Sequence, residues 1–375
     1  MNFGFTAEQD LLRDQIKRFV ADSCPSSAVR CFSRDPGAAR AELWPLLSGL
    51  GCFGALIDED HGGLGLKWVD HVVVLEELGR GLCPLPAIPQ TLSILALARH
   101  GPSALRQQWL KGLIDGSRIM VPAWMDAPHR SAGAVQVQVH AALRESGHEL
   151  TGTKRFVVHA DIADSFLVAF TSDAHPGKIC LGAVESGPSV TVRVQPSVDE
   201  TKSMADLVLD RVTVAQDSIL VLSVDEFNQL LDFGALATCA EALGAVEAAL
   251  ELTVQYARQR VQFGVPIGKF QGVKHPLANM YVDLESMKSL TYFAAWTADS
   301  HPAAFPKAVS LAKGFLGDAF NKMAVECVNL HGAMGFTAEY DIQLFLKRAK
   351  WVRPAFGDGQ FHFSRSAALG TQHGF

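Results

Sequence analysis

The sequence predicts an α+β protein of several domains: a helical domain, then a β domain, then a helical bundle. Apolar residues recur at helical spacing up to about residue 116, and this spacing returns from about residue 225. Between them, short β-branched runs are separated by Gly, Pro, Asp and Ser. The 375 residues also exceed the ~250–300 that one core supports. The predicted domains are residues 1–117, 118–222 and 223–375.

The first helical domain begins with an amphipathic segment whose apolar residues run from Leu11 to Val20. Thr6, followed by Glu8 and Gln9, predicts a helix cap. The glycine-rich stretch DEDHGGLGL at 58–66 lacks the Lys-Ser/Thr pair of a phosphate loop, so we expect a tight turn between helices.

The middle domain is predicted from runs that alternate or are rich in β-branched residues. Their punctuation is typical of an antiparallel barrel or sandwich, and the pattern does not choose between the two. The predicted strands lie within residues 134–143, 148–158, 164–171, 179–185, 190–196 and 205–214.

Three long helical segments follow and predict an up-and-down bundle. The first, 227–258, is dense in Gly and Ala, which permits close approach of a neighbouring helix. The second is expected to start after His275-Pro276, with proline in the first turn, and to run to about Asp299. The third spans about 306–330.

Composition excludes several classes of function. The net charge of −6 lacks the basic excess that nucleic-acid binding needs. The 7 cysteines show neither CxxC spacing nor a paired-histidine pattern, so no metal site is expected. The N-terminal segment is not a signal peptide, and no apolar run approaches the ~20 residues of a membrane span. We therefore expect a soluble cytoplasmic protein that binds neither nucleic acid nor membrane.

The most specific stretch is YARQRVQFGVPIGKFQGVKHPLANM, residues 256–280. It places Arg258 and Arg260 near a helix C-terminus, where cations complement the helix dipole. The alternative is a guanidinium offered to a phosphate group. A second distinctive stretch, HGAMGFTAEYDI, occupies residues 331–342.

Together these stretches resemble the acyl-CoA dehydrogenase family. The likeness covers nearly the whole chain and includes FTAEQDLLRDQIKRF, EDHGGLGL, VVLEELGRGL and LTGTKRFVVHADIADSFLV in the family's order. The resemblance implies a helical N-terminal domain, a β-barrel-like middle and a C-terminal four-helix bundle, assembled as dimers or dimers of dimers. It also implies FAD as cofactor, an acyl-CoA substrate and electron-transfer flavoprotein or a similar acceptor.

In such proteins the flavin ring lies against the β domain of one subunit and the ADP portion against the C-terminal domain of a neighbour. The resemblance implies that Arg260 and Gln262 meet the pyrophosphate, with Phe263 close by. Phe270 and Gln271 would line the adenosine side. The backbone N–H groups of the stretch that includes Asn329, Gly332 and Ala333 would lie near the ADP. The family prefers Gln at 329 and Gly at 333.

The chain departs from the family at the flavin ring. In WMDAPHRS, residues 124–131, Met125 stands where the family has a threonine, and Val158 replaces a second hydroxyl near flavin N5. Each lost hydrogen bond costs about 0.5–1.5 kcal/mol. Two such losses argue against a normal ring site in this subunit.

The catalytic glutamate is also missing. The family places it in one of two locations, which correspond here to Phe356 (Gly357 with a one-residue shift) and Gly234. Asp358 lies in the first loop, and one branch of the superfamily uses aspartate as its base. The more favoured interpretation of Asp358 is a turn or helix cap. For Glu241, two turns beyond Gly234, a polar residue on a helix edge is favoured.

Three hypotheses remain. The first is the base-lacking subunit of a heteromeric α2β2 acyl-CoA dehydrogenase, acting for example on steroid side-chain CoA thioesters, which donates ADP-side contacts to a homologous partner that carries the glutamate. The second is a self-sufficient flavoenzyme that uses Asp358. The third is a scaffold protein without flavin. The first hypothesis explains best why this chain has the family's residues on the ADP side but no acidic residue at either base position.

Overall fold

The computed structural model describes residues 5–126 and 137–372. Its contacts concentrate in two compact units. Unit 1 consists of Met1–Val29, Trp68–Cys83 and Ala235–Phe375, and unit 2 of Arg30–Lys67 and Pro84–Gly234. The long helix α7 (Val224–Gln259) begins in unit 2 and continues in unit 1. The three domain boundaries drawn from the sequence stay a prediction.

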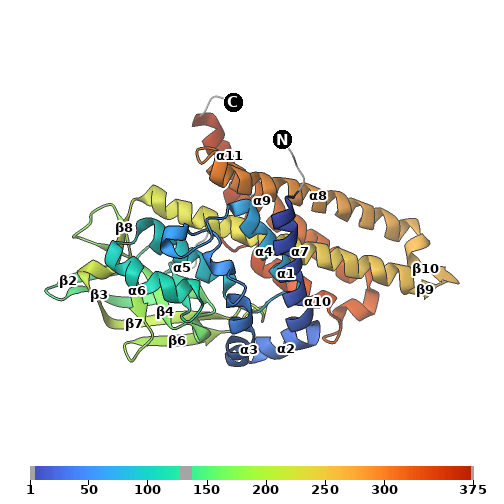
Figure 1. Ribbon diagram of the computed structural model, residues 1–375. Helices are drawn as coiled ribbons and strands as arrows, with labels where there is room; N and C mark the ends of the chain where they lie inside the picture. The colour runs from blue at the N-terminus through green and yellow to red at the C-terminus, as the bar shows by residue number, and fades with distance from the viewer. Residues whose placement is uncertain (1–4, 127–136, 373–375) are drawn as a thin grey trace. The chain divides into compact units, whose positions relative to one another are not determined.

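Unit 1 is helical. Figure 1 shows the long helices α7, α8 and α9 running alongside one another, with the β9–β10 hairpin at the far end, where α7 turns into α8. Its elements besides α7 are α1 (Ala7–Ser23), α4 (Trp68–Arg80), β9 (Val261–Gln262), β10 (Val265–Pro266), α8 (Gln271–Ser300), α9 (Phe305–Leu330), α10 (Ile342–Val352) and α11 (Gly359–Gln372). The helix α2 (Ser26–Arg34) lies at a boundary between the units.

The predicted start of the first helix is confirmed. The Thr6 hydroxyl accepts a hydrogen bond from the backbone N–H of Gln9, and the Gln9 side chain accepts one from the backbone N–H of Thr6. This reciprocal pair is a capping box, which satisfies two N–H groups that the helix itself leaves unpaired.

The small residues of α7 allow helix α4 to approach very closely. A Cβ atom at Gly244 would lie 1.7 Å from the carbonyl oxygen of Glu76, and one at Gly79 would lie 1.7 Å from that of Glu241. Each helix therefore presents a glycine to the backbone of the other. The close approach predicted from the Gly and Ala content is confirmed.

The second long helix begins earlier than predicted. α8 starts at Gln271, so Pro276 lies inside the helix rather than in its first turn, and the predicted start was wrong. The N–H groups of Val273 and Lys274 both donate to the carbonyl of Phe270, which closes a first turn before the proline. The other two long helices, predicted at 227–258 and 306–330, are confirmed by α7 and α9.

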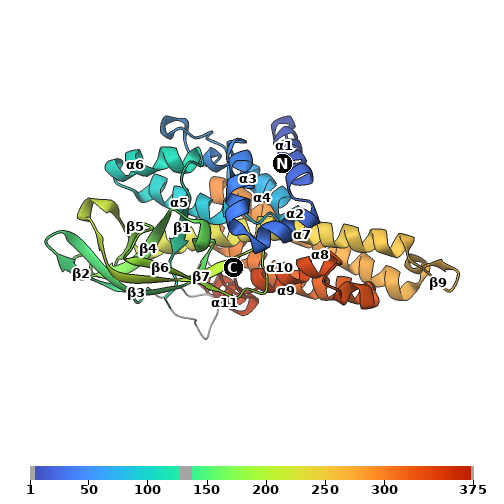
Figure 2. The same ribbon diagram turned by 90° about the horizontal axis from the view of Figure 1, so that it is seen from below.

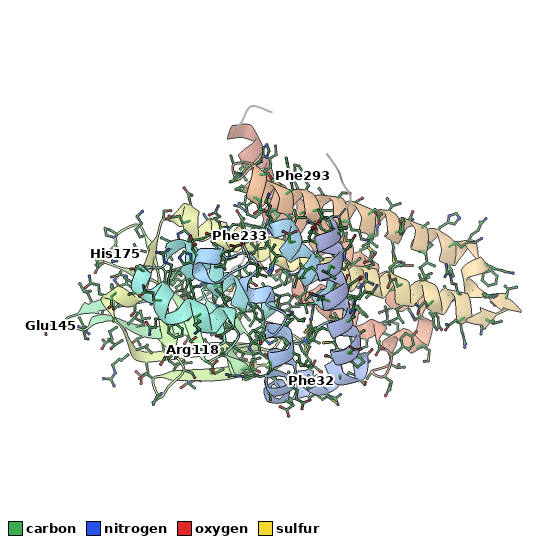
Figure 3. The ribbon with its side chains drawn as sticks, viewed as in Figure 1. Phe32, Arg118, Glu145, His175, Phe233 and Phe293 are labelled. Carbon is green, nitrogen blue, oxygen red and sulfur yellow. The ribbon has the colours of Figure 1, made fainter. Side chains whose placement is uncertain are left out.

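Unit 2 combines helices with an eight-stranded sheet, which Figure 2 shows beside α5 and α6. Its helices are α3 (Pro36–Ser48), α5 (Ala87–His100), α6 (Ser103–Ile114) and the start of α7. Phe233 on α7, which Figure 3 labels, is buried, and the guanidinium carbon of Arg99 on α5 lies 4.5 Å from the centre of its ring. The strands are β1 (Met120–Ala123), β2 (His140–Arg144), β3 (Gly147–Val158), β4 (Ser165–Ser172), β5 (Ile179–Glu185), β6 (Val190–Gln195), β7 (Met204–Val214) and β8 (Ile219–Leu222).

The sheet is mixed, whereas the spacing of the predicted strands was typical of an antiparallel barrel or sandwich. Its order is β6-β7-β3-β2-β4-β5-β8, and β4 pairs in parallel with both β1 and β2. The sequence of β4, SFLVAFTS, is almost wholly buried, as expected for a central strand covered on both faces. The short strands β1 and β8 were not predicted, and residues 134–136 of the first predicted strand lie outside the described residues.

One described helix is long and apolar enough to cross a membrane. It is α7, and 89% of its most apolar 18-residue window is buried inside the fold. This helix was overlooked in the sequence because Glu241 and Glu247 interrupt its apolar run, while alanine, leucine and valine keep the mean hydropathy high. A buried core helix passes the same test of length and composition.

Candidate functional site

The predicted ADP-side residues gather at the end of unit 1 where α7 turns into α8. Gly264 and Phe263 both have left-handed backbones, with φ values of 79° and 53°, which form the tight turn of the hairpin. The turn leaves the Phe263 side chain 92% exposed, in edge contact with the ring of Phe270. Together with Phe270, which is 37% exposed, Phe263 forms an apolar surface suited to a ligand or another chain.

Arg260 and Gln262 also point their polar groups outward. The backbone of Arg260 is fixed, because its N–H donates to the carbonyl of Tyr256 at 2.8 Å and its carbonyl accepts from the N–H of Ile267 at 2.8 Å. Within residues 5–126 and 137–372, the side chains of Arg260 and Gln262 have no hydrogen-bond or ion-pair partner. An exposed guanidinium on a fixed backbone fits an anionic group such as a pyrophosphate.

The second predicted segment follows the end of α9. Asn329, Gly332 and Ala333 are all exposed, and Gly332 has a left-handed φ of 60°. They lead into the short 3₁₀ helix η6 (Gly332–Phe336), whose Met334 and Phe336 are 48% and 75% exposed.

A pair of aromatic rings in tilted contact joins the two segments. The ring of Tyr256, one turn before Arg260, lies 4.4 Å from that of His331, and the Tyr256 hydroxyl donates to the His331 carbonyl at 3.3 Å. The buried His331 ring donates from Nδ1 to the carbonyl of Cys327 at 2.7 Å. Burial lowers the pKa of His331, which favours the neutral ring. The structure therefore brings the Arg260 segment and residues 329–333 to one end of unit 1.

The loop that could carry a base has an unusual backbone. Phe356 has a left-handed φ of 54°, and Gly357 has a φ of 110°. Asp358 follows them and caps α11, because its Oδ1 accepts from the backbone N–H of Phe361 at 2.9 Å. The capping role considered for Asp358 in the sequence is thus present in the structure.

Sequence reasoning missed the residue that lies beneath this loop. Lys313 on α9 is fully buried, and its Nζ donates to the carbonyls of Gly357 at 2.8 Å and of Arg353 at 3.2 Å. Burial lowers the pKa of Lys313 to about 8. A signal was present, since Lys313 lies four residues after Val309 and seven before Phe320, on the apolar face of its helix.

Glu241 lies within unit 1 and is committed to a structural pair. Its Oε1 lies 2.6 Å from Nη1 of Arg348, and both side chains are buried. The interpretation of Glu241 as a polar residue on a helix edge was therefore wrong. Its carboxylate compensates a guanidinium that has no exposure to solvent. Gly234, the other predicted base position, lies within α7.

The ring-side positions lie in unit 2. The carbonyl of Met125 accepts from the N–H of Arg155 at 2.7 Å, and Val158 ends β3. Beside them, Asp126 forms an ion pair with Lys154, and both side chains are buried. Burial lowers the pKa of Lys154 to about 8. Residues 127–131 of the divergent stretch lie outside the described residues.

Comparisons with known proteins decide the family. The family model "Acyl-CoA dehydrogenase, N-terminal domain" matches residues 6–117, and "Acyl-CoA dehydrogenase, C-terminal domain" matches residues 225–368. Acyl-CoA dehydrogenase IpdE2 of Mycolicibacterium smegmatis is 31% identical over 343 residues, which cover 91% of this chain and 92% of the relative.

The chain belongs to the acyl-CoA dehydrogenase family. The family consists of oxidoreductases that act on a CH–CH bond, and the resemblance drawn from the sequence motifs is confirmed. The fold is confirmed too: an N-terminal helical domain, a middle sheet domain and a C-terminal helical domain.

Two solved structures are similar over nearly the whole chain. The ChsE4–ChsE5 complex from Mycobacterium tuberculosis has a TM-score of 0.88 and 27% identity, covering 99% of both chains. A variant of the Tcur3481–Tcur3483 steroid ACAD has a TM-score of 0.87 and 27% identity, covering 98% of both chains. Among the described residues of the present chain, no cluster of three or more His, Cys, Asp or Glu could hold a metal ion.

Proposed function

We propose that this chain is the base-lacking subunit of a heteromeric FAD-dependent acyl-CoA dehydrogenase. It contributes ADP-side contacts to an FAD whose ring is held by a homologous partner subunit. The partner supplies the glutamate that removes the Cα proton of the acyl-CoA. The chain acts as an oxidoreductase only within that assembly.

The observation that carries the proposal is the contrast between the two ends of the expected flavin site. Arg260, Gln262 and Phe263 are exposed on a fixed turn, whereas the loop position of the base is Phe356. Without a carboxylate, proton abstraction forgoes a general-base contribution of ~10²–10⁴-fold. A chain with one end of the site and not the other is expected to share its site with a neighbour.

The chain's own residues have defined roles in this proposal. The Arg260 guanidinium and the Gln262 amide would hold the pyrophosphate, with Phe263 close by. Phe270 and Gln271 border the adenosine, while the backbone at Asn329, Gly332 and Ala333 offers N–H groups to the ADP. FAD supplies the acceptor for the hydride that leaves Cβ. These contacts keep the cofactor oriented toward the partner's active site.

The proposed substrate is an acyl-CoA thioester, with a steroid side-chain CoA as the favoured class. Support comes from the similarity to the steroid ACAD named above, at 27% identity. The similarity to a ChsE4–ChsE5 complex supports a partner chain of a different sequence. We propose electron-transfer flavoprotein or a similar protein as electron acceptor and the cytoplasm as location.

The test is the visible flavin absorbance of purified protein. The chain is expressed alone and together with each homologous acyl-CoA dehydrogenase chain of its own genome that carries a glutamate at the base position. The proposal expects a colourless protein alone and a yellow complex with one such partner. A protein that stays colourless with every partner overturns it and supports a scaffold without flavin.

A self-sufficient enzyme that uses Asp358 is the other outcome of this test. It predicts a yellow homo-oligomer whose activity is lost in Asp358→Asn. The N-terminal capping contact of Asp358 weighs against it, because that contact already engages one carboxylate oxygen.

A further inference from the structure

The loop 353–358 is held by a closed set of contacts in unit 1. Lys313 donates from below to the carbonyls of Arg353 and Gly357, at the two sides of the loop. The Nε2 of His362, a buried residue of α11, donates to the carbonyl of Phe356 at 2.9 Å. Three backbone carbonyl groups within residues 353–357 are therefore held by side chains of α9 and α11.

The outer side of the loop is closed by an ion pair. Nε of Arg353 lies 2.7 Å from Oδ1 of Asp318, on the same helix as Lys313. A Cβ atom at Gly359 would lie 2.4 Å from Oδ2 of Asp318, so the start of α11 packs directly against this carboxylate. The loop is bound to α9 at both ends.

The backbone at the centre of the loop depends on these contacts. Phe356 adopts a left-handed conformation that costs about 1 kcal/mol or more for a bulky residue and persists only when its surroundings enforce it. At Gly357 a Cβ atom would lie 2.7 Å from Nε2 of His362, so no other residue fits without movement. The direction of the side chain at 356 follows from this conformation.

We propose that Lys313 is a positioning residue: its buried ammonium group sets the conformation of the loop and thereby the orientation of the side chain at position 356. Position 356 is one of the two positions at which the resemblance to the family places the base, so Lys313 maintains the geometry of that position although the carboxylate itself is absent. The inference concerns contacts within this chain and does not depend on FAD or on a partner.

The charge on Lys313 provides a readout that a passive packing residue lacks. The groups that face it are Cys239 on α7, Asp318 on α9 and Asp358 and His362 around the loop. Burial raises the pKa of Cys239 to about 12 and lowers that of His362 to about 3. Of these groups with a shifted pKa, Lys313 alone changes charge near pH 8.

The experiment places a fluorine reporter at the loop. 4-Fluorophenylalanine is incorporated at position 356 of the full chain, and its ¹⁹F NMR shift is followed from pH 6.5 to pH 9.5. If Lys313 sets the loop conformation, the ¹⁹F shift should change with pH, with a midpoint near pH 8. This titration should disappear in Lys313→Met and persist in Lys322→Met, a matched change of an exposed lysine on the same helix.

Two results overturn the inference. One is a ¹⁹F shift that does not change between pH 7 and pH 9 in the chain with Lys313 intact, a measurement that requires no variant at 313 to fold. The other is a titration that Lys313→Met leaves unaltered.

Discussion

The carboxylate of Glu241 lies 2.6 Å from the guanidinium of Arg348, and both side chains are buried. Removing one partner of a buried ion pair costs about 3–5 kcal/mol, because the remaining charge loses the group that offsets its desolvation. We therefore expect Glu241→Gln to lower the free energy of unfolding by about this amount, measured by urea denaturation. The double variant Glu241→Met with Arg348→Met should lose much less. Equal losses in the single and double variants would contradict the role assigned to the pair.

Replacement by alanine should have opposite effects on stability at two helical glycines, because only Gly244 lies at the crossing of α4 and α7. Gly244→Ala should destabilise the protein by about 3 kcal/mol, because the added Cβ meets the backbone oxygen of Glu76 at 1.7 Å. Gly272→Ala, on α8, adds a Cβ that meets nothing within 4 Å and should stabilise by about 0.5–1 kcal/mol. Thermal unfolding of both variants checks the pair, and a stabilising effect of Gly244→Ala would refute the close crossing.

Stability should fall in mild acid because of a buried histidine. Burial lowers the pKa of His71 in the folded chain to about 4, below its ordinary value of 6.5. As the pH falls, the unfolded chain takes up a proton at His71 before the folded chain does. The contribution of neutral His71 to the free energy of unfolding is therefore fully present above pH 6.5 and is lost as the pH falls toward 4. At pH 5 the loss from this one group is about 2 kcal/mol.

The measurement is urea unfolding at pH 7.5 and pH 5. His71→Phe keeps a ring of similar size that cannot be protonated, so its loss between the two pH values should be smaller by about 2 kcal/mol. The matched control is His61→Phe, at an exposed position. If the control reduces the loss as much as His71→Phe does, the burial of His71 is not its cause.

The flavin content of the assembled protein should depend on Arg260. Removing a hydrogen bond to a charged group costs about 1.5–3 kcal/mol, so Arg260→Ala should weaken FAD binding roughly 10–100-fold. The side chain is exposed, and the unfolding free energy of the chain should not change. Arg193→Ala, at another exposed arginine, serves as control. FAD retained equally by both variants after dialysis would exclude Arg260 from the cofactor site.

The extent to which the sequence predicted the structure follows from the range of the interactions involved. The long helices α7 and α9 and the β3, β4 and β7 strands were predicted because their patterns repeat over many residues. The start of α8 was misplaced because proline is common in the first turn of a helix, and the five residues of α8 before Pro276 carry no apolar pattern. The parallel pairing of β4 with β1 and β2 depends on long-range packing that no local pattern records.

The same reasoning applies to the site. The residues of the Arg260 turn could be proposed from the sequence because their motif is contiguous. The contact between Tyr256 and His331 could not, because it joins segments 75 residues apart. Lys313 and Glu241 were missed as buried groups, since a charged residue within a helical pattern is ordinarily taken as exposed. The outward direction of Phe263 depends on a left-handed backbone that only the structure reveals.

We infer that this chain completes a flavin site without supplying the base. The most direct test is Asp358→Asn in the active assembly with the partner, measured as acyl-CoA dehydrogenation. Asparagine caps a helix as well as aspartate does, so the fold is kept while the one carboxylate of the loop is removed. Because the partner carries the base, kcat should be unchanged. A loss of 10²-fold or more would show that Asp358 is the base and would contradict this inference.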